Sequence, residues 1–327
     1  MRAIWYDRTG PAREVLQFGE LPTPAPGHGQ ALVRIRASGV NPSDVGMRGG
    51  AMGAMAYPRI TPNSDGAGVV EAVGPGVAAA WVGKRVWFYN GQRNGRAFGS
   101  AAEYIELDTD LLTELPDTVT FAEGATLGIP CMTAHRALFL AGPVQGRTVL
   151  VTGGAGAVGH YAVQLAKWAG ATVIATASSP DKLERARGGG ADHVIDYRRE
   201  DVAARVRELT DGAGVHHVVD VDFGGNLAAN LASLRMNGSL AYYASKGGQT
   251  PVVPAGEVMR LNLLIQGVYL PVSPHAARKR AQEDITGWIG TGDRLLSVAG
   301  RFPLDDCAGA HELVESGTKV GTAVVEP

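Results

Sequence analysis

The turn that follows Val149, in the sequence VLVTGGAGAVGHYAVQLAKWAG, has residue types and spacing that indicate a specific chemical task. Three glycines fit the pattern G-x-G-x-x-G between a β-branched strand and an amphipathic helix. The first glycine allows a tight turn, the second lets the backbone approach a pyrophosphate, and the third lets the helix lie close to the strand. The N–H groups at the helix start favour an anion. We expect a dinucleotide here, with a purely structural turn as the alternative. The residues expected to hold it are Gly154, Gly156, Ala157, Val158 and Gly159.

The end of the next expected strand, Thr172–Thr176, indicates which dinucleotide binds. Enzymes that use NAD usually place an acidic residue there, about 20 residues after the turn, on the ribose hydroxyls. This chain has Ala177, Ser178 and Ser179 instead, and Lys182 follows within one helical turn. A hydroxyl and a cation suit a 2′-phosphate, which an acid would repel, so the sequence favours NADPH. The alternative is that Ser178 merely caps the helix entered through Pro180 and Asp181.

The elements that must position this turn alternate between strands and helices from about residue 147 onward. Such alternation predicts a doubly wound parallel sheet. The expected strands are Thr148–Thr152, Thr172–Thr176, His193–Asp196, Val215–Val221 and Ser239–Tyr243, with helices that include Ala157–Trp168 and Asp181–Arg187. A further helix is expected over Pro274–Ile289, before short strands that end near Val325.

The first 125 residues have a different pattern, in which short β-branched runs lie between glycine, proline and asparagine. This pattern is typical of a small β-barrel or sandwich. The expected strands are Gln30–Val40, Gly68–Val73, Lys84–Tyr89 and Ala102–Leu107. The fold class is therefore α/β, with a β-rich part beside a parallel nucleotide-binding domain.

The composition excludes several classes of protein. Of 327 residues, 45 are glycine without a three-residue period, which excludes collagen. The net charge of −2 disfavours nucleic-acid or membrane-surface binding by bulk electrostatics. Two cysteines are too few for a disulfide framework or a four-thiolate zinc site. The sequence has no signal-peptide pattern and no apolar run of membrane-spanning length, so we expect a cytoplasmic protein.

Several further segments, together with the glycine turn, resemble one family over nearly the whole chain. The chain resembles the zinc-free quinone oxidoreductases, the zeta-crystallin-like branch of the medium-chain dehydrogenase/reductase superfamily. The matching segments are GVNPSD from Gly39, PNSDGAGVVEAVG from Pro62, GKRV from Gly83, AAEYIEL from Ala101, GIPCMTAHRAL from Gly128 and GADHVIDYRRED from Gly190.

This resemblance implies a GroES-like β-barrel catalytic domain over residues 1–125, completed by residues 266–327, and a Rossmann domain that binds NADPH over residues 126–265. It also implies roles for individual residues. Asn41 and Thr133 should lie near the nicotinamide. Asp44 matches a position near the site, and the alternative is a structural acid paired with a base such as Arg48. The residues expected to wall the cofactor are Tyr243, Ala244, Ser245 and Leu270, and those expected around the 2′-phosphate are Ser178, Lys182 and Tyr197.

The resemblance also implies that no metal is bound. Zinc alcohol dehydrogenases of the wider family hold their catalytic metal at positions that correspond here to Asn41, Ser64 and Ile129. None of these is a good zinc ligand. We interpret Cys131 as a small buried hydrophobe and the His216–His217 pair as local packing.

Without a metal to polarise a carbonyl, the acceptor must already be electron-poor and conjugated. The first expectation is an NADPH-dependent quinone oxidoreductase, and the alternative is a reductase of enoyl, enal or haloacrylate substrates. Family members also act as crystallins or RNA-binding proteins. The only basic run, Arg278–Arg280, is interpreted as a solvated helix face, so no nucleic acid is expected.

Two further expectations come from the same resemblance. Some family members carry a tyrosine that faces the substrate where this chain has Gly46, so either the pocket is wider or Tyr57 reaches into it. The family usually forms homodimers or tetramers, often through the edge of the Rossmann sheet, and we expect a homodimer.

Overall fold

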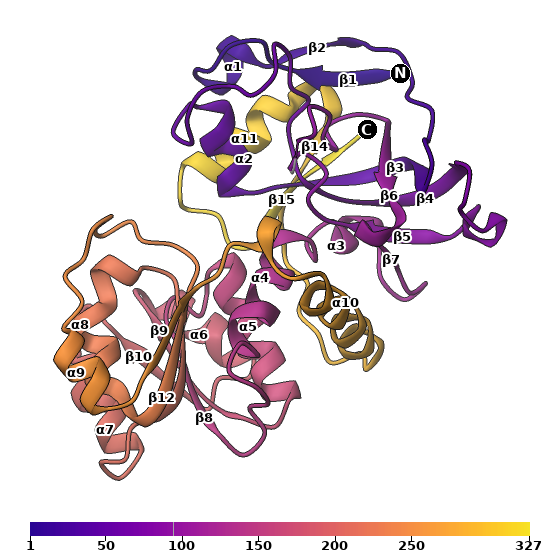
Figure 1. Cartoon of the computed structure of the whole chain (residues 1–327). Coiled ribbons are helices and arrows are strands. Elements are labelled where there is room, and N and C mark those ends of the chain that lie inside the picture. The colour runs from indigo at the N-terminus through magenta and orange to yellow at the C-terminus, as the bar shows by residue number, and fades with distance from the viewer. Residues whose placement is uncertain (94) are drawn as a thin grey trace. The chain divides into compact units, whose positions relative to one another are not determined.

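The computed structural model describes residues 1–93 and 95–327, which form two compact units. Unit 1 comprises Met1–Pro130 and Leu296–Pro327, and unit 2 comprises Cys131–Leu295 (Figure 1). The second boundary lies at Leu295 and not at residue 265. The reason is packing within unit 2, where Trp288 meets the ring of Tyr161 edge-on at 6.0 Å and Leu295 N donates to Gln164 Oε1 at 2.7 Å.

Unit 1 is built on a mainly antiparallel seven-stranded sheet whose paired order is β14-β15-β3-β4-β5-β7, with β6 pairing with β3. No strand pairing among the described residues joins β7 to β14. The expected barrel is therefore not closed by hydrogen bonds between its two end strands. A two-stranded sheet of β1 and β2 accompanies it. The strands are β1 (Arg2–Trp5), β2 (Gln17–Glu20), β3 (Gln30–Val40), β4 (Asp65–Val73), β5 (Arg85–Phe88), β6 (Tyr104–Asp108), β7 (Leu112–Glu114), β14 (Val298–Pro303) and β15 (Thr322–Glu326).

The helices of unit 1 are short, and one of them sets the position of a predicted site residue. Helix α2 (Pro42–Arg48) begins after Asn41, with proline at its first position and the Asp44 side chain accepting the Asn41 backbone N–H at 2.8 Å. This capping arrangement fixes where Asn41 lies. The others are α1 (Ala12–Val15), α3 (Phe121–Gly124), α11 (Cys307–Glu315) and the 3₁₀ turns η1 (Ala79–Trp81), η2 (Thr109–Leu111) and η4 (Leu304–Asp306). Helix α4 (Ile129–Leu138) begins in unit 1 and continues into unit 2.

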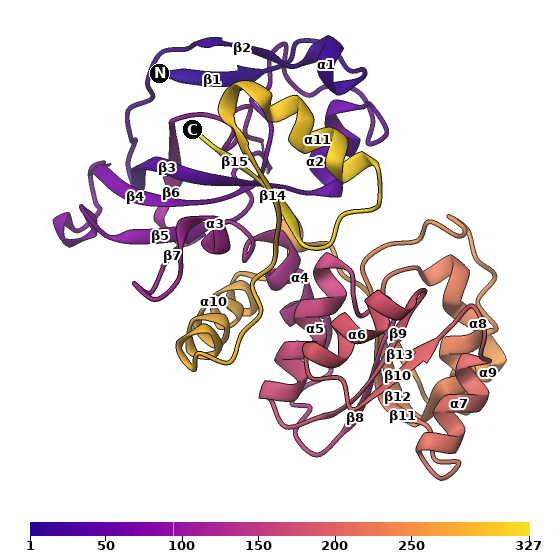
Figure 2. The same cartoon turned by 180° about the vertical axis from the view of Figure 1, so that it is seen from behind.

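Unit 2 confirms the predicted doubly wound fold. Its six parallel strands lie in the order β10-β9-β8-β11-β12-β13. Helices α5 and α6 cover one face of the sheet, and α7, α8 and α9 cover the other (Figure 2). The strands are β8 (Thr148–Val151), β9 (Thr172–Ala177), β10 (His193–Asp196), β11 (Val215–Asp220), β12 (Leu234–Tyr242) and β13 (Leu264–Gly267). The helices are α5 (Ala157–Trp168), α6 (Pro180–Gly188), α7 (Val202–Leu209), α8 (Phe223–Ser233), α9 (Ala255–Arg260), α10 (His275–Gly290) and the turn η3 (Leu270–Val272).

Most of the predicted elements are observed within a few residues of their expected bounds. β4 begins at Asp65 and not at Gly68, and β1, β2, β7 and β13 were not predicted. Strand β12 begins at Leu234, whereas the sequence predicted Ser239. Its first residues, Arg235–Asn237, are exposed and do not show the apolar pattern of a buried parallel strand. No helix among the described residues is long and apolar enough to cross a membrane.

Candidate functional site

The glycine-rich turn of unit 2 lies between β8 and α5, and its strand β8 is paired with both β9 and β11. The order of the sheet reverses between β8 and β11, which is where doubly wound folds bind nucleotides. Gly153 adopts a left-handed conformation with φ of 64° and donates its N–H to Thr176 Oγ1 at 3.1 Å. The tight turn therefore depends on Gly153, and the prediction that Gly154 has this task is wrong.

The other glycines of the turn allow close contacts. A Cβ at Gly154 would lie 2.8 Å from Ala175 Cβ, so this glycine lets the turn pack on β9. A Cβ at Gly159 would lie 2.2 Å from Gly153 O, so its close-packing role is confirmed. Gly156 is the N-cap of α5. The first N–H groups of α5, at Ala157 and Val158, have no partner within the helix and offer donors to an anion.

The residues predicted to surround a 2′-phosphate follow two adjacent strands. β9 and β10 are paired up to Ala177 and Asp196, and Tyr197 N donates to Ala177 O at 3.2 Å. Ser178 and Tyr197 therefore leave the sheet side by side. The ring of Tyr197 is 49% exposed. The N-cap of α6 is Ser179, without a side-chain cap bond, so the alternative in which Ser178 caps this helix is wrong. Lys182 has no ion pair or hydrogen bond among the described residues.

The residues predicted to wall the cofactor follow β12 at the same edge of the sheet. Tyr243 N donates to Asp220 O at 3.1 Å, and Ala244 O accepts from Phe223 N at 2.9 Å. Burial raises the pKa of the Tyr243 phenol. Ser245 Oγ accepts from Gly224 N at 3.0 Å, and Leu270 is buried in η3. These bonds tie the end of β12 to the end of β11.

Two contacts near the turn were missed from the sequence. Thr152 Oγ1 donates to the fully buried Asp220 Oδ1 at 2.6 Å and accepts from Val221 N at 2.9 Å, which locks the ends of β8 and β11 together. Arg185 of α6 donates to Ala155 O within the turn at 3.2 Å. The only sequence signal for the first contact is a polar residue at the end of each of two apolar strands.

Unit 1 contains a second candidate group, a buried polar cluster around Asn41. Asp44 Oδ1 accepts from Ser64 Oγ at 2.8 Å and from Arg93 Nη2 at 3.1 Å. The side chains of Asp44 and Arg93 are 0% and 5% exposed. Asp44 is thus paired with a base, and that base is Arg93. The predicted partner, Arg48, instead contacts Glu315 and the carbonyl of Gly10.

Asp65 of β4 is the second acid in this cluster and is fully buried. Its Oδ2 accepts from Asn41 Nδ2 at 2.7 Å and from Ile129 N at 2.8 Å, while Oδ1 has no hydrogen-bond partner in the described part of the chain. Burial, with the nearby charge of Asp44, raises the pKa of Asp65 to about 8. The cluster therefore combines one acid neutralised by Arg93 with one that holds its proton at neutral pH.

The remaining predicted residues are placed as follows. Thr133 is buried in α4 within unit 2, so the predicted catalytic residues belong to both units. Cys131 is fully buried, as expected for a small hydrophobe. His217 bonds to Ser239 Oγ at 2.7 Å and Ala137 O at 2.9 Å, which confirms local packing. The hydroxyl of Tyr57 donates to Gly95 O inside unit 1.

The positions that match zinc ligands in relatives have other tasks in this chain. Asn41 bonds to Asp65, Ser64 bonds to Asp44, and Ile129 uses its backbone N–H. Among residues 1–93 and 95–327, no group of three or more His, Cys, Asp or Glu side chains is arranged to hold a metal ion.

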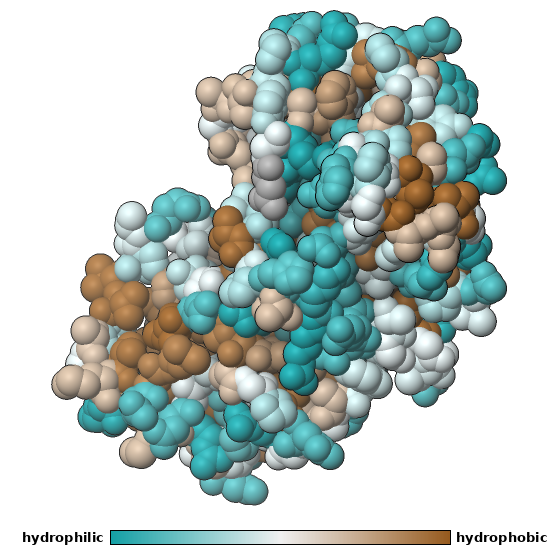
Figure 3. Space-filling model, turned by 45° about the vertical axis from the view of Figure 1, so that its right-hand side comes forward, coloured by the Kyte–Doolittle hydropathy of each residue, from teal (hydrophilic) through white to brown (hydrophobic). Residues whose placement is uncertain are grey.

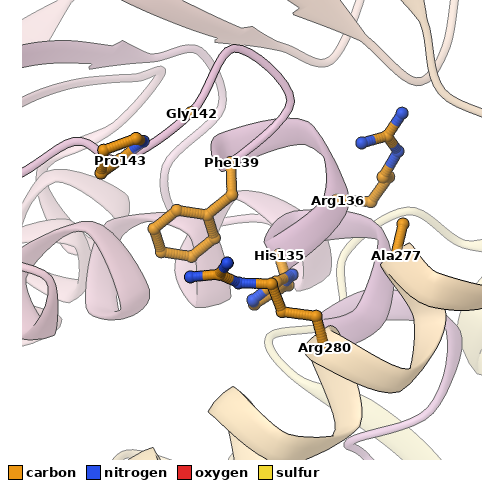
Figure 4. Close-up of a pocket in the computed structure, with 7 residues that line it drawn as sticks. All are labelled: His135, Arg136, Phe139, Gly142, Pro143, Ala277 and Arg280. Carbon is orange, nitrogen blue, oxygen red and sulfur yellow. The ribbon is translucent and has the colours of Figure 1, made fainter.

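Arg280, the last residue of the basic run Arg278–Arg280, lines a small cavity of about 160 Å³ between α4 and α10. In Figure 4, Arg280 is turned toward the ring of Phe139. Arg280 Nε lies 3.4 Å from Asp284 Oδ2, and Asp284 also bonds to His135 Nε2 at 2.8 Å. Arg280 is 73% exposed at its side chain, as expected for a solvated helix face.

Comparisons with known proteins agree with this architecture. Residues 27–117 match the alcohol dehydrogenase GroES-like domain, and residues 157–284 match the family described as zinc-binding dehydrogenase. A Rattus norvegicus quinone oxidoreductase is 30% identical over 329 residues, with 99% of this chain and 97% of that protein covered. A Burkholderia 2-haloacrylate reductase is 32% identical over 341 residues, with 100% and 99% covered.

Solved structures give the same result. A mycobacterial quinone oxidoreductase superposes with a TM-score of 0.89 at 34% identity, with each chain covered to 100%. An Escherichia coli quinone oxidoreductase complexed with NADPH superposes with a TM-score of 0.86 at 27% identity, also with full coverage of both. Since these relatives match over the full length and both units carry the corresponding folds, the chain belongs to the quinone oxidoreductase branch of the medium-chain dehydrogenase/reductase superfamily.

Proposed function

We propose that this protein is an NADPH-dependent quinone oxidoreductase. The observation that carries the proposal is the edge of unit 2, where the glycine turn lies at the reversal of strand order. At this edge Ser178 and Lys182 are without partners among the described residues, and no acid stands at residues 177–179 at the end of β9. A phosphate at the 2′ position would find a hydroxyl and an ammonium group there. The Escherichia coli relative, whose structure contains NADPH, supports this choice of cofactor.

The residues of unit 2 hold the cofactor in this proposal. The N–H groups at the start of α5 bind the pyrophosphate, because helix N-termini favour anions. Ser178, Lys182 and Tyr197 surround the 2′-phosphate. The residues that wall the nicotinamide half are Thr133, Tyr243, Ala244, Ser245 and Leu270. When bound, NADPH supplies a hydride.

In this proposal, residues of unit 1 bind and position the acceptor. Asn41 offers an amide N–H that can donate to an oxygen on which negative charge develops. Asp44 does not add charge to this region, since its carboxylate is paired with Arg93 at 3.1 Å. The product oxygen then takes its proton from water. Asn41 and Asp44 are therefore assigned a binding and a positioning task, with no general acid among them.

We propose that the reaction is independent of zinc, because asparagine, serine and isoleucine stand at the three ligand positions. Without a strong Lewis acid, hydride transfer favours acceptors that are already conjugated. A chelator should therefore leave the rate of NADPH oxidation unchanged. A loss of activity after dialysis against a chelator, restored by zinc, would contradict this assignment.

A second candidate function is the reduction of α,β-unsaturated carbonyl compounds, because the Burkholderia relative is named for 2-haloacrylate. Both functions use the same cofactor and the same kind of conjugated acceptor. The deciding experiment is a screen of NADPH oxidation with quinones, enals, enones and 2-haloacrylates, run in parallel with NADH. The acceptor class with the highest kcat/KM identifies the function, and a preference for NADH would contradict the proposed cofactor.

We further propose that two copies of the chain associate through the edge of the sheet in unit 2. Among the residues that the structure describes, strand β13 is paired only with β12. Large apolar side chains on and around it are exposed, with Met259 at 78%, Leu264 at 46% and Tyr269 at 55%. Figure 3 shows a concentration of apolar side chains on this unit. An unpaired apolar edge is a site where strands of another chain can add.

A further inference from the structure

Asp65 is the member of the buried cluster in unit 1 that has no task in the proposed function. Its exposed fraction is 0%, so its carboxyl group does not reach a substrate by itself. Asn41 is also buried, at 3% exposed, and in the proposed function it is the residue that donates to the acceptor. The two side chains share a hydrogen bond of 2.7 Å from Asn41 Nδ2 to Asp65 Oδ2. Any effect of Asp65 on a reaction therefore passes through Asn41.

The hydrogen bonds fix which way the Asn41 amide is turned. An asparagine amide has two N–H donors on one side and a carbonyl acceptor on the other. Asp65 Oδ2 also accepts the backbone N–H of Ile129 at 2.8 Å, so this oxygen is an acceptor whether or not the other oxygen carries a proton. A flipped amide would place the carbonyl oxygen of Asn41 against Asp65 Oδ2, and the hydrogen bond would be lost.

The surroundings leave Asp65 little room to move. A Cβ at Gly128 would lie 2.2 Å from both Cγ and Oδ1 of Asp65, so the Gly128 backbone packs directly against the carboxyl group. Ser100 Oγ donates to the Asp65 carbonyl at 2.6 Å. The backbone of Asn41 is held separately, by its N–H to Asp44 Oδ2 at 2.8 Å. Asn41 is thus fixed at both its backbone and its side chain.

One N–H of the Asn41 amide remains without a protein acceptor among the described residues. We propose that Asp65 is a positioning residue, which holds the amide of Asn41 so that this second N–H donates to the acceptor oxygen. This inference rests on the proposed function. A donor aimed at developing negative charge stabilises the transition state more than the ground state, because the charge is larger there. The orientation of Asn41 therefore controls kcat more than the binding of NADPH.

The test compares two substitutions of Asp65 in the full-length protein. Asp65→Ala removes the acceptor and frees the Asn41 amide. We expect kcat with the best acceptor to fall by about 10-fold or more, as for loss of an oxyanion donor, while KM for NADPH stays unchanged. Asp65→Asn keeps a carbonyl oxygen that can accept from both Asn41 and Ile129. It should restore kcat close to that of the wild type.

A double-mutant cycle separates positioning from a general loss of structure. Once the amide is misoriented, Asn41→Ala should add little to Asp65→Ala, since residues that act as a unit are non-additive. Ser233→Ala is the control. Ser233 is fully buried in α8 of unit 2, where its Oγ donates to Ala229 O at 2.7 Å, and it is not part of the proposed site. Its substitution should lower the melting temperature without changing kcat.

A measurement without turnover tests the orientation of the Asn41 amide separately from the proposed function. In protein labelled with ¹⁵N-asparagine, exchange of the Asn41 side-chain amide protons with water should be slow in the wild type and in Asp65→Asn, and faster in Asp65→Ala. Equal exchange in all three, or additive effects in the cycle, would overturn the role of Asp65. If the wild type oxidises NADPH with none of the acceptors, the proposed function fails, and the exchange rates still decide whether Asp65 orients Asn41.

Discussion

At the scale of single residues, the buried charge of Asp44 is paired within the protein, whereas the charge of Lys182 is available to a ligand. In unit 1 the carboxylate of Asp44 is neutralised by Arg93 at 3.1 Å, and both side chains are buried. In unit 2 Lys182 has no counter-ion among the described residues. A buried charge must be paired to be tolerated, whereas a partly exposed charge without a partner is available for a ligand. Lys182 is therefore the residue at which cofactor choice is most directly tested.

Lys182→Ala should weaken NADPH binding by about 10- to 100-fold, because a charge-assisted hydrogen bond contributes about 1.5–3 kcal/mol. NADH, which has no 2′-phosphate, should be affected little. Isothermal titration with both cofactors checks this. Lys84→Ala, which removes a cation from unit 1, is the control and should change neither affinity. Equal losses for the two cofactors would show that Lys182 does not recognise the 2′-phosphate.

At the scale of elements, the glycine turn is shaped by how closely its backbone approaches neighbouring atoms. Gly153 provides the left-handed residue, Gly154 packs on β9, and Gly159 lets α5 approach the carbonyl of Gly153. Arg185 donates to Ala155 and so ties α6 to the turn. These contacts hold the turn in one conformation, so the N–H groups at the start of α5 are already oriented before an anion binds.

Gly159→Ala should distort the glycine turn, because its Cβ would lie 2.2 Å from Gly153 O. We expect a loss of about 1–3 kcal/mol in the free energy of unfolding, typical of overpacking, together with weaker NADPH binding. Gly256→Ala is the matched control. Gly256 lies in helix α9, and a Cβ there would meet nothing within 4 Å. Chemical denaturation and cofactor titration of both variants distinguish a steric effect at the turn from a general effect of glycine replacement.

At the scale of the whole molecule, buried neutral histidines connect stability to pH. Burial lowers the pKa of His160 and of His217 to about 4, and that of His311 to about 3. In the unfolded chain a histidine has a pKa near 6.5. Between these values the unfolded state binds more protons than the folded state, so the free energy of unfolding decreases as the pH falls below about 6.5.

The melting temperature should therefore be lower at pH 5 than at pH 7. Each such histidine lowers the free energy of unfolding by up to about 1.4 kcal/mol for each pH unit in this range. His311 Nε2 bonds to Asn63 Oδ1 at 3.0 Å. His311→Gln keeps a donor for this bond but cannot take up a proton. The difference in melting temperature between pH 5 and pH 7 should be smaller in this variant. An unchanged difference would exclude His311 as a contributor.

The proposed association of two chains is also tested at this scale. Leu264→Lys places a charge on the exposed edge strand β13, which disfavours pairing between edges. Sedimentation should show a dimer for the wild type and a monomer for this variant. Phe18→Lys changes a residue of β2 that is 47% exposed in unit 1, and it should remain dimeric. A monomeric wild type would contradict the proposal.

Much of this protein is determined by local sequence. The strands Gln30–Val40 and His193–Asp196 and the helix Ala157–Trp168 were predicted to the residue, because apolar periodicity and flanking glycines define them. The G-x-G-x-x-G pattern predicted a cofactor site at the turn between β8 and α5, and the absence of an acid at residues 177–179 favoured NADPH. The sequence could do this because a nucleotide turn is built from consecutive residues, whose backbone conformations are constrained by which positions lack a Cβ.

Only the tertiary structure decided the pairings between distant residues. Asp44 pairs with Arg93 and not with the neighbouring Arg48, and Asp65 meets Asn41 and Ile129 from three separate segments. The boundary of unit 2 lies at Leu295 because α10 and the segment after it pack on α5. Such contacts depend on which strands and helices lie side by side. A pattern of spacing along one segment carries no information about them, since burial and partner choice are set by the packed fold.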